Sequence, residues 1–263
     1  MNLKLCSILH SNSKVISKLY LCRMPYPHQV VIVIPVYKPF PDPEEIRALR
    51  RAVSVFSRHP IRLLGPDDID YSVYLDAGID RCSIIQMPGH HFRGIKAYNR
   101  LLCSKGFYAI FDVFEYILIF QTDAWVFRDE LSEWCERGYD YIGSPWLWRP
   151  ERVKNSQILD LWPLMKGRVG NGGVSLRKIK VMKKYALLAR IFFALTAKNE
   201  DFIWLLVSLL PGVRIKKPNA DEALKFCIEM EPEEALNRTG SLPFTVHAYM
   251  RYGADYWKAY MPD

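Results

Sequence analysis

Residues 30–36 constrain the fold of this chain more than any other segment. They read Val-Val-Ile-Val-Ile-Pro-Val, a run that is wholly apolar and mostly β-branched. A strand with one face in water alternates apolar and polar residues, whereas a continuous apolar run is typical of a central parallel strand that is buried on both faces. The sequence therefore predicts a sheet that is covered on both sides.

Further strands alternate with helices as far as about residue 143. Apolar runs predict strands over 61–64, 83–87, 116–120 and 139–143, and apolar residues at helical spacing predict helices between them. The first helix has clear start signals, because Asp42, Pro43 and Glu45 form a capping-box pattern. This alternation predicts an α/β fold with an open, mainly parallel sheet and helices on both faces.

The second half of the chain is less regular. We expect a long loop over 144–170, a short strand over 174–176, and helices over 177–196 and from 199 to about 211. We expect a single domain over 28–263 and an N-terminal arm, residues 1–27, outside it. The helix over 177–196 combines basic residues with a wide apolar stripe, made of Ile179, Met182, Leu187, Ile191 and Leu195.

Composition excludes several classes of protein. Half of the 263 residues are hydrophobic and 24% are charged, which excludes a disordered or fibrous chain. No apolar run is long enough for a spanning helix, and no secretory signal is recognisable, so we expect a cytoplasmic protein. The six cysteines form no C-x-x-C pair, which fits reduced thiols. The net charge of +8 fits an anionic partner, such as nucleic acid, anionic lipid or nucleotide phosphates.

Polar residues that follow the strand over 116–120 are the first candidates for a site. Ligands of open α/β sheets bind outside the carboxyl ends of the strands, where Gln121-Thr122-Asp123 is expected to lie. An ionised Asp123 there can hold a divalent cation through its oxygens, or it can cap the next turn through backbone N–H groups. The three residues alone leave both interpretations open.

Three other segments each have two interpretations. Glu200 and Asp201 either stabilise the first turn of a helix through its dipole, or they provide a general base. The same dipole would keep such a base ionised at neutral pH. The segment over 170–173, Gly-Asn-Gly-Gly, is a turn or a place where substrate approaches the backbone. His247 is a packed core residue or a ligand. Trp146 and Trp148 lie in a polar loop and can stack on a sugar face.

The order of these segments resembles that of GT-A-type glycosyltransferases. Gln-Thr-Asp-Ala-Trp, Gly-Ser-Pro-Trp and Gly-Asn-Gly-Gly are followed by Asn-Glu-Asp and a late histidine. The sequence is most similar to a bacterial family that is described only as a domain of unknown function, with presumed glycosyltransferase activity. The resemblance covers about residues 30–253 and omits the N-terminal arm.

The resemblance implies a role for particular residues. Asp123 matches the second acid of the D-x-D motif and, with His247, would hold Mn²⁺ or Mg²⁺, whereas Gln121 replaces the first acid and weakens that expectation. Asp201, with Glu200 beside it, matches the catalytic segment of inverting members. The residues that would bind the donor are Pro35, Val36, Tyr37, Arg93, Tyr98, Asn99, Gln121 and Asp123. Those near the acceptor or the transferred sugar would be Trp146, Asn171, Gly172 and Gly173.

The implied function is transfer of a sugar from a nucleotide-sugar to a hydroxyl acceptor, in bacterial surface polysaccharide or glycoconjugate synthesis. Residues 28–143 would form the nucleotide-binding half and 144–263 the acceptor half. One alternative is a basic module that binds nucleic acid or a membrane. Because Tyr185, Phe192 and Phe193 do not interleave with the basic residues of their helix, we expect no nucleic acid, whereas peripheral membrane contact stays open. Another alternative, favoured by Gln121, is a degenerate transferase fold that only binds.

Overall fold

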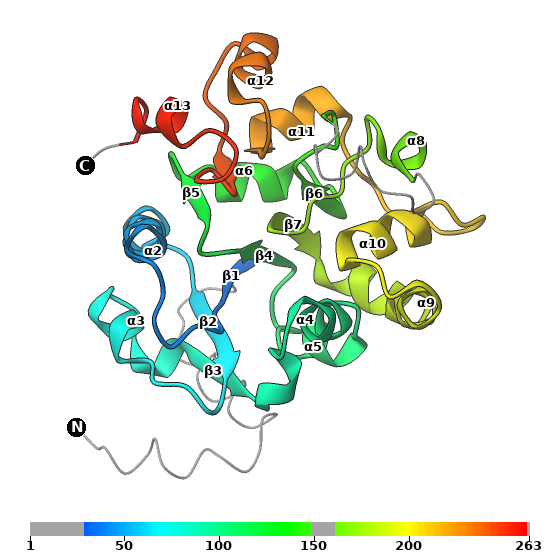
Figure 1. The fold of residues 1–263 in the computed structure, drawn as a ribbon. Helices are drawn as coiled ribbons and strands as arrows, with labels where there is room; N and C mark the ends of the chain where they lie inside the picture. Colours follow the sequence, from blue (N-terminus) through cyan, green and yellow to red (C-terminus); the bar gives the residue numbers. More distant parts are fainter. Residues whose placement is uncertain (1–28, 149–160, 262–263) are drawn as a thin grey trace.

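A computed structural model describes residues 29–148 and 161–261, so the expected N-terminal arm lies outside the described residues. Its main sheet has the strand order β3-β2-β1-β4-β7-β6 (Figure 1). All neighbouring pairs are parallel except those of β7, which runs antiparallel to β4 and β6. The expected open, mainly parallel sheet is confirmed. Its strands are β1 (Val30–Pro35), β2 (Ile61–Pro66), β3 (Ile84–Met87), β4 (Tyr116–Phe120), β6 (Tyr141–Gly143) and β7 (Val174–Lys178).

Strand β1 is buried on both faces, as its composition predicts. Ile32 and Ile34 point into one core, and Val31 and Val33 into a second core on the other side of the sheet. Figure 1 shows the helices on either side of this sheet, and the two cores pack between the sheet and these two groups of helices. One group includes α2 (Pro43–Val55), α3 (Ser72–Asp76) and α6 (Leu131–Glu136); the other includes α4 (Ile95–Leu102), α5 (Lys105–Ala109), α9 (Ile179–Thr196) and α10 (Glu200–Ser208).

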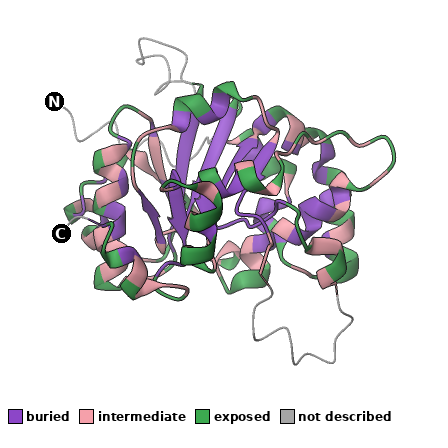
Figure 2. Cartoon of the chain, turned by 90° about the horizontal axis from the view of Figure 1, so that it is seen from above, coloured by how far each residue is buried: buried purple, intermediate pink, exposed green. Residues whose placement is uncertain are grey.

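A second, small sheet has the order β5-β9-β8 and was not expected from the sequence. Its strands are only two or three residues long, too short for an apolar periodicity to show: β5 (Ala124–Val126), β8 (Cys227–Ile228) and β9 (Thr245–His247). The remaining helices are α8 (Trp162–Met165), α11 (Ala220–Phe226), α12 (Pro232–Thr239) and α13 (Ala254–Lys258), with short 3₁₀ turns at Arg81–Ser83 and Gly89–His91. Figure 2 shows the buried strands enclosed by helices whose outer faces are exposed.

Helix α9 only partly follows its predicted stripe. Ile179 and Met182 are buried, but Leu187, Ile191 and Leu195 are 73%, 48% and 76% exposed. The core side of α9 is formed by Ile179 and Met182 together with Tyr185, Ala186, Ala189 and Phe193, so the apolar stripe is divided between a buried part and an exposed part. Among the described residues no helix is long and apolar enough to cross a bilayer.

Helix α9 ends at Ala197, whose φ of 50° lies in the left-handed region. A Cβ disfavours this conformation, and glycine adopts it freely. We therefore expect Ala197→Gly to raise the free energy of unfolding by about 0.5–1 kcal/mol, as measured by chemical denaturation. Ala194→Gly, at an exposed position inside the same helix, is the matched control and should lower it by about 1 kcal/mol. A loss of stability in both variants would contradict the expectation.

Candidate functional site

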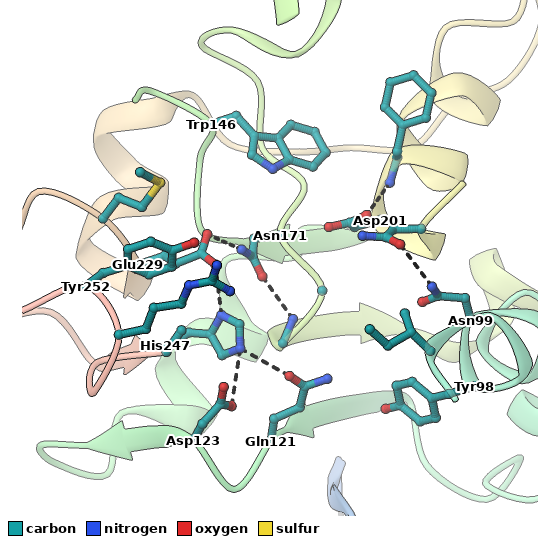
Figure 3. Close-up of a pocket in the computed structure, with 18 of the residues that line it drawn as sticks. Tyr98, Asn99, Gln121, Asp123, Trp146, Asn171, Asp201, Glu229, His247 and Tyr252 are labelled. Atoms are coloured by element: carbon teal, nitrogen blue, oxygen red, sulfur yellow. Dashed lines mark hydrogen bonds and ion pairs between the residues drawn. The ribbon is translucent and has the colours of Figure 1, made fainter. Parts of the chain in front are cut away.

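A cavity of about 1130 Å³ opens at the carboxyl ends of β1 and β4, where the sequence placed the ligand site. Figure 3 shows its centre. Twelve of the residues to which the sequence resemblance gives a role line it: Pro35, Tyr37, Tyr98, Asn99, Gln121, Asp123, Trp146, Asn171, Gly172, Gly173, Asp201 and His247. Val36, Arg93 and Glu200 are not among its lining residues. Because the lining comes from both halves of the chain, the cavity forms only when the whole domain folds.

The small sheet brings three titratable side chains together. Ala124 of β5 pairs with His247 of β9, so Asp123 lies directly beside that histidine. Strand β8 runs parallel to β9, with Ile228 opposite Val246, so Glu229 follows at the same edge as His247. Figure 3 shows these side chains converging from separate elements. The register of two short strand pairs therefore builds this part of the site.

His247 is held between two carboxylates and an amide. Its Nε2 lies 3.1 Å from the Gln121 Oε1 and 3.4 Å from the Asp123 Oδ1, while its Nδ1 lies 3.4 Å from the Glu229 Oε1. Burial lowers the pKa of His247, but the hydrogen bonds and charges of Asp123 and Glu229 outweigh it and raise the pKa to about 10. Burial raises the pKa of Asp123, yet the hydrogen bond and charge of His247 leave it below its usual value. The environment of Nε2 therefore favours positive charge.

Gly173 allows this arrangement because it has no side chain. A Cβ on Gly173 would lie 2.0 Å from the His247 Nε2. The residue is fixed on both sides, since its carbonyl accepts the Gln121 N–H at 3.0 Å and its N–H donates to the Asn171 Oδ1 at 3.0 Å. The Asn171 amide also donates to the Glu229 carboxylate. The glycine-rich segment thus packs directly against His247 and is hydrogen-bonded to Gln121 and Glu229.

Glu45 is hydrogen-bonded to the loop that follows β4. Its Oε2 accepts the Asp42 N–H at 2.9 Å, which confirms that part of the capping box. The same side chain accepts the Thr122 hydroxyl at 3.0 Å and pairs with Lys38 at 2.9 Å. One helix-capping residue therefore links the end of β1 to the Gln121-Thr122-Asp123 loop.

Glu200 and Asp201 face different surroundings although they are neighbours in sequence. Glu200 is 5% exposed and pairs at 2.8 Å with Arg177, whose side chain is fully buried. The Arg177 guanidinium also donates to Ser175 and Tyr108 at 2.9 and 3.0 Å. These bonds fix the start of α10 against β7, and Asp201 is left to line the cavity.

The ionisation of Asp201 differs from the sequence expectation. Burial, followed by the charge of Glu200, raises its pKa to about 7, although the Phe202 N–H donates to the carboxylate at 2.7 Å. At pH 7 the carboxylate is therefore about half ionised, less than a helix dipole alone would give, because desolvation and a neighbouring acid outweigh a dipole effect of this size. Figure 3 shows Asp201 across the cavity from Asp123 and His247, with Asn171 between them.

One wall of the cavity is aromatic. Trp146 packs so closely on Gly170 that a Cβ there would lie 1.8 Å from the indole ring. Trp148 also lines the cavity, and its Nε1 donates to Glu234 at 2.7 Å. Flat apolar rings held in this way are suited to stacking on the apolar face of a sugar.

Unusual backbone conformations cluster at the cavity. Among the described residues, the non-glycine residues with positive φ are Ala197, Glu231 and Ala248. Ala197 and Ala248 line the cavity, and Glu231 lies one residue beyond Met230, which also lines it. Strained backbone of this kind is concentrated at functional sites in proteins.

Sequence reasoning missed Glu229, Asn199 and Glu45 as site residues. Asn199 accepts a hydrogen bond from Asn99 at 3.2 Å and lines the cavity, and it directly precedes the two acids that the sequence did single out. For Glu45, the sequence predicts only a role in capping the first helix. Glu229 follows a strand of two residues, so no periodic signal marks it. Only the pairing of β8 with β9 reveals its position.

The fold is that of glycosyltransferases of known structure. Galactosyltransferase LgtC, solved with donor and acceptor sugar analogs, matches with a TM-score of 0.52 and 16% identity, over 88% of this chain and 94% of LgtC. Core-mannan synthase A (CmsA/Ktr4) from Aspergillus fumigatus, solved in an Mn/GDP form, matches with a TM-score of 0.50 and 9% identity, over 74% of this chain and 73% of the synthase. No curated protein matches the sequence.

The sequence profile of the family described as "Protein of unknown function (DUF5672)" matches residues 81–247. The chain belongs to this family. The matched segment includes Gln121, Asp123, Asp201 and His247, and it omits β1 and β2.

Proposed function

We propose that the protein is a glycosyltransferase that moves a sugar from a nucleotide-sugar donor to a hydroxyl acceptor. One observation carries the proposal: oxygen and nitrogen donors of Gln121, Asp123 and His247 converge in a large cavity at the carboxyl ends of the strands. The fold shared with glycosyltransferases supports it. The acceptor we expect is a hydroxyl of a bacterial surface polysaccharide or glycoconjugate, as the sequence resemblance implies.

The spacing of the His247 Nε2 from the other two donors fits a divalent cation, which would bind once Nε2 has given up its proton. The His247 Nε2 lies 3.1 and 3.4 Å from the other two donor atoms, and adjacent ligands of an octahedral Mg²⁺ are about 3 Å apart, given bonds of about 2.1 Å. Among the described residues no three His, Cys, Asp or Glu side chains form a metal site by themselves, so the Gln121 amide would complete the set. Bound there, the ion would offset charge on the diphosphate of the donor.

The remaining roles follow from which side chains line the cavity. Pro35 and Tyr37 would contact the nucleoside at the end of β1, and Trp146 would stack on the acceptor or the transferred sugar. Asp201 would accept the proton of the acceptor hydroxyl. As that oxygen bonds to the anomeric carbon, the bond from this carbon to the diphosphate oxygen breaks, and its electron pair leaves with the nucleoside diphosphate. Glu200 would position Asp201 through its ion pair with Arg177.

The test is a thermal-shift screen of UDP-, GDP-, CMP- and dTDP-sugars, each with and without Mn²⁺. We expect one nucleotide class together with Mn²⁺ to raise the melting temperature by roughly 5–10 °C at a hundredfold excess over Kd. Transfer or hydrolysis of that donor should follow. A melting temperature that no combination of donor and metal changes would refute the proposal.

The variant Asp123→Asn should lose the part of this shift that depends on Mn²⁺, because a neutral amide replaces the only carboxylate among the proposed ligands. Asp255→Asn is the matched control, since Asp255 is a highly exposed carboxylate on α13, and should retain the full shift. Equal Mn²⁺ dependence in the two variants would show that the cation binds elsewhere.

The substitution of Gln121 for an acid favours a second candidate, a transferase fold that binds its donor without turning it over. The site then carries one carboxylate fewer for the metal. A thermal shift with donor and Mn²⁺, without detectable sugar transfer or donor hydrolysis, would support this candidate. Turnover that is abolished by Asp123→Asn would exclude it.

A further inference from the structure

Helix α9 exposes a narrow stripe along most of its length. Its residues recur at steps of three or four, which places them on one side of the helix. All are exposed: Lys180, Lys184, Leu187, Ile191, Ala194 and Leu195. We refer to these six residues as the α9 stripe. Leu187, Ile191 and Leu195 are large apolar side chains that are exposed on the same helix face, and such a group is unusual on the surface of a protein.

The charged residues of α9 itself are all basic. Helix α9 carries Lys180, Lys183, Lys184 and Arg190, and no acidic residue. Two acids of neighbouring elements form ion pairs here, Asp112 with Lys183 and Glu115 with Lys178 just before the helix, and the charge of Asp140 also reaches Tyr185. Neither pairing involves a residue of the stripe. The stripe is therefore apolar toward its C-terminal end and basic toward its N-terminal end.

We propose that the α9 stripe docks the protein on an anionic membrane surface. Interfacial helices bind bilayers through a shallow apolar face flanked by lysine and arginine, and the stripe has both features. Its three large apolar side chains offer much less area than a stable protein–protein interface needs. A second copy of the chain would bring another basic stripe against this one, and like charges would oppose such a dimer.

The aromatic residues of α9 do not favour nucleic acid as the partner. Tyr185 and Phe193 are buried against the core, so neither presents a ring on which bases can stack. The rings are instead part of the packing that holds α9 on the domain.

Docking in this way would place the cavity close to the bilayer. The segment that follows the stripe, Ala197-Lys198-Asn199, lines the cavity directly. An acceptor held at a membrane surface would then reach the site without leaving the interface. The docking itself does not depend on the proposed activity, because it rests on the exposed face of α9 alone.

The experiment is co-sedimentation of the full chain with vesicles of phosphatidylcholine alone, or of phosphatidylcholine with phosphatidylglycerol. We expect binding to the anionic vesicles only, weakened by salt. Lys180→Glu/Lys184→Glu should reduce the partition coefficient about tenfold or more, because each lysine near an anionic surface strengthens binding roughly fivefold. Leu187→Ser/Leu195→Ser should also reduce it about tenfold, since it removes the apolar contact.

The matched control is Lys258→Glu/Tyr260→Ser at α13, which lies far from α9 (Figure 1). Lys258 and Tyr260 are both exposed, as are the residues changed in α9. It should bind as the unaltered chain does, and unchanged melting temperatures would show that all variants fold. Equal recovery in the supernatant with and without anionic vesicles would overturn the proposal. So would binding that the α9 variants leave unchanged, or a dimer in sedimentation velocity that these variants dissociate.

Discussion

Gly173→Ala is expected to lower metal-dependent activity by about 10²-fold. The new Cβ would lie 2.0 Å from the His247 Nε2, far inside contact distance. The segment is held in place, because the Gly173 carbonyl accepts the Gln121 N–H and the next residue, Val174, is paired with Phe120 in the main sheet. The imidazole must therefore turn aside, and misplacement by about 1 Å can cost about 10²-fold in rate.

Two measurements separate loss of the site from loss of the fold. The Gly173→Ala variant should lose its Mn²⁺-dependent thermal shift together with its activity, while overpacking lowers its stability by about 1–3 kcal/mol. Gly106→Ala is the matched control, because a Cβ there meets nothing within 4 Å and its φ is ordinary. Full Mn²⁺ response in Gly173→Ala would show that the His247 ring has room to move, and that it is not a ligand.

The sequence predicts the centre of the main sheet well because β1 and β4 are continuous, buried apolar runs. The strand over 30–36, the helix start at Asp42 and Pro43, and the strand over 116–120 all agree with the structure to within a residue or two. Each of these signals is local: a buried strand needs a continuous apolar run, and a helix start needs a cap. Such signals survive in a single sequence because they do not depend on a distant partner.

The parts of the site that depend on distant partners could not be predicted in this way. Glu229 reaches His247 only because β8 pairs with β9, and β8 has two residues. The burial of Glu200 depends on Arg177, which lies 23 residues away and is itself fully buried. The exposure of Leu187, Ile191 and Leu195 could not be predicted either, since periodicity shows an apolar stripe but not whether another element covers it.

Asp201 is the residue for which the sequence and the structure give different chemistry, and its titration provides the second large effect. A base must be ionised to accept a proton, and the pKa of Asp201 is raised to about 7 by burial and by Glu200. We therefore expect kcat/KM to fall about tenfold for each pH unit below 7 and to reach a plateau above it. A profile that stays flat from pH 5 to 9 would contradict this role.

Asp201→Asn should reduce the rate by about 10²–10⁴-fold and remove the acid limb of the profile, because an amide cannot accept the proton. Asp221→Asn is the matched control: Asp221 also lies in the first turn of a helix, but its side chain is 62% exposed. Because the pKa of Asp201 is higher in the folded than in the unfolded protein, its protonated form adds to the free energy of unfolding at low pH. This contribution is lost as the pH rises through about 7. At pH 8 the Asp201→Asn variant should therefore melt no lower than the unaltered chain. A loss of rate at this pH would then be caused by the missing proton acceptor and not by unfolding of the protein.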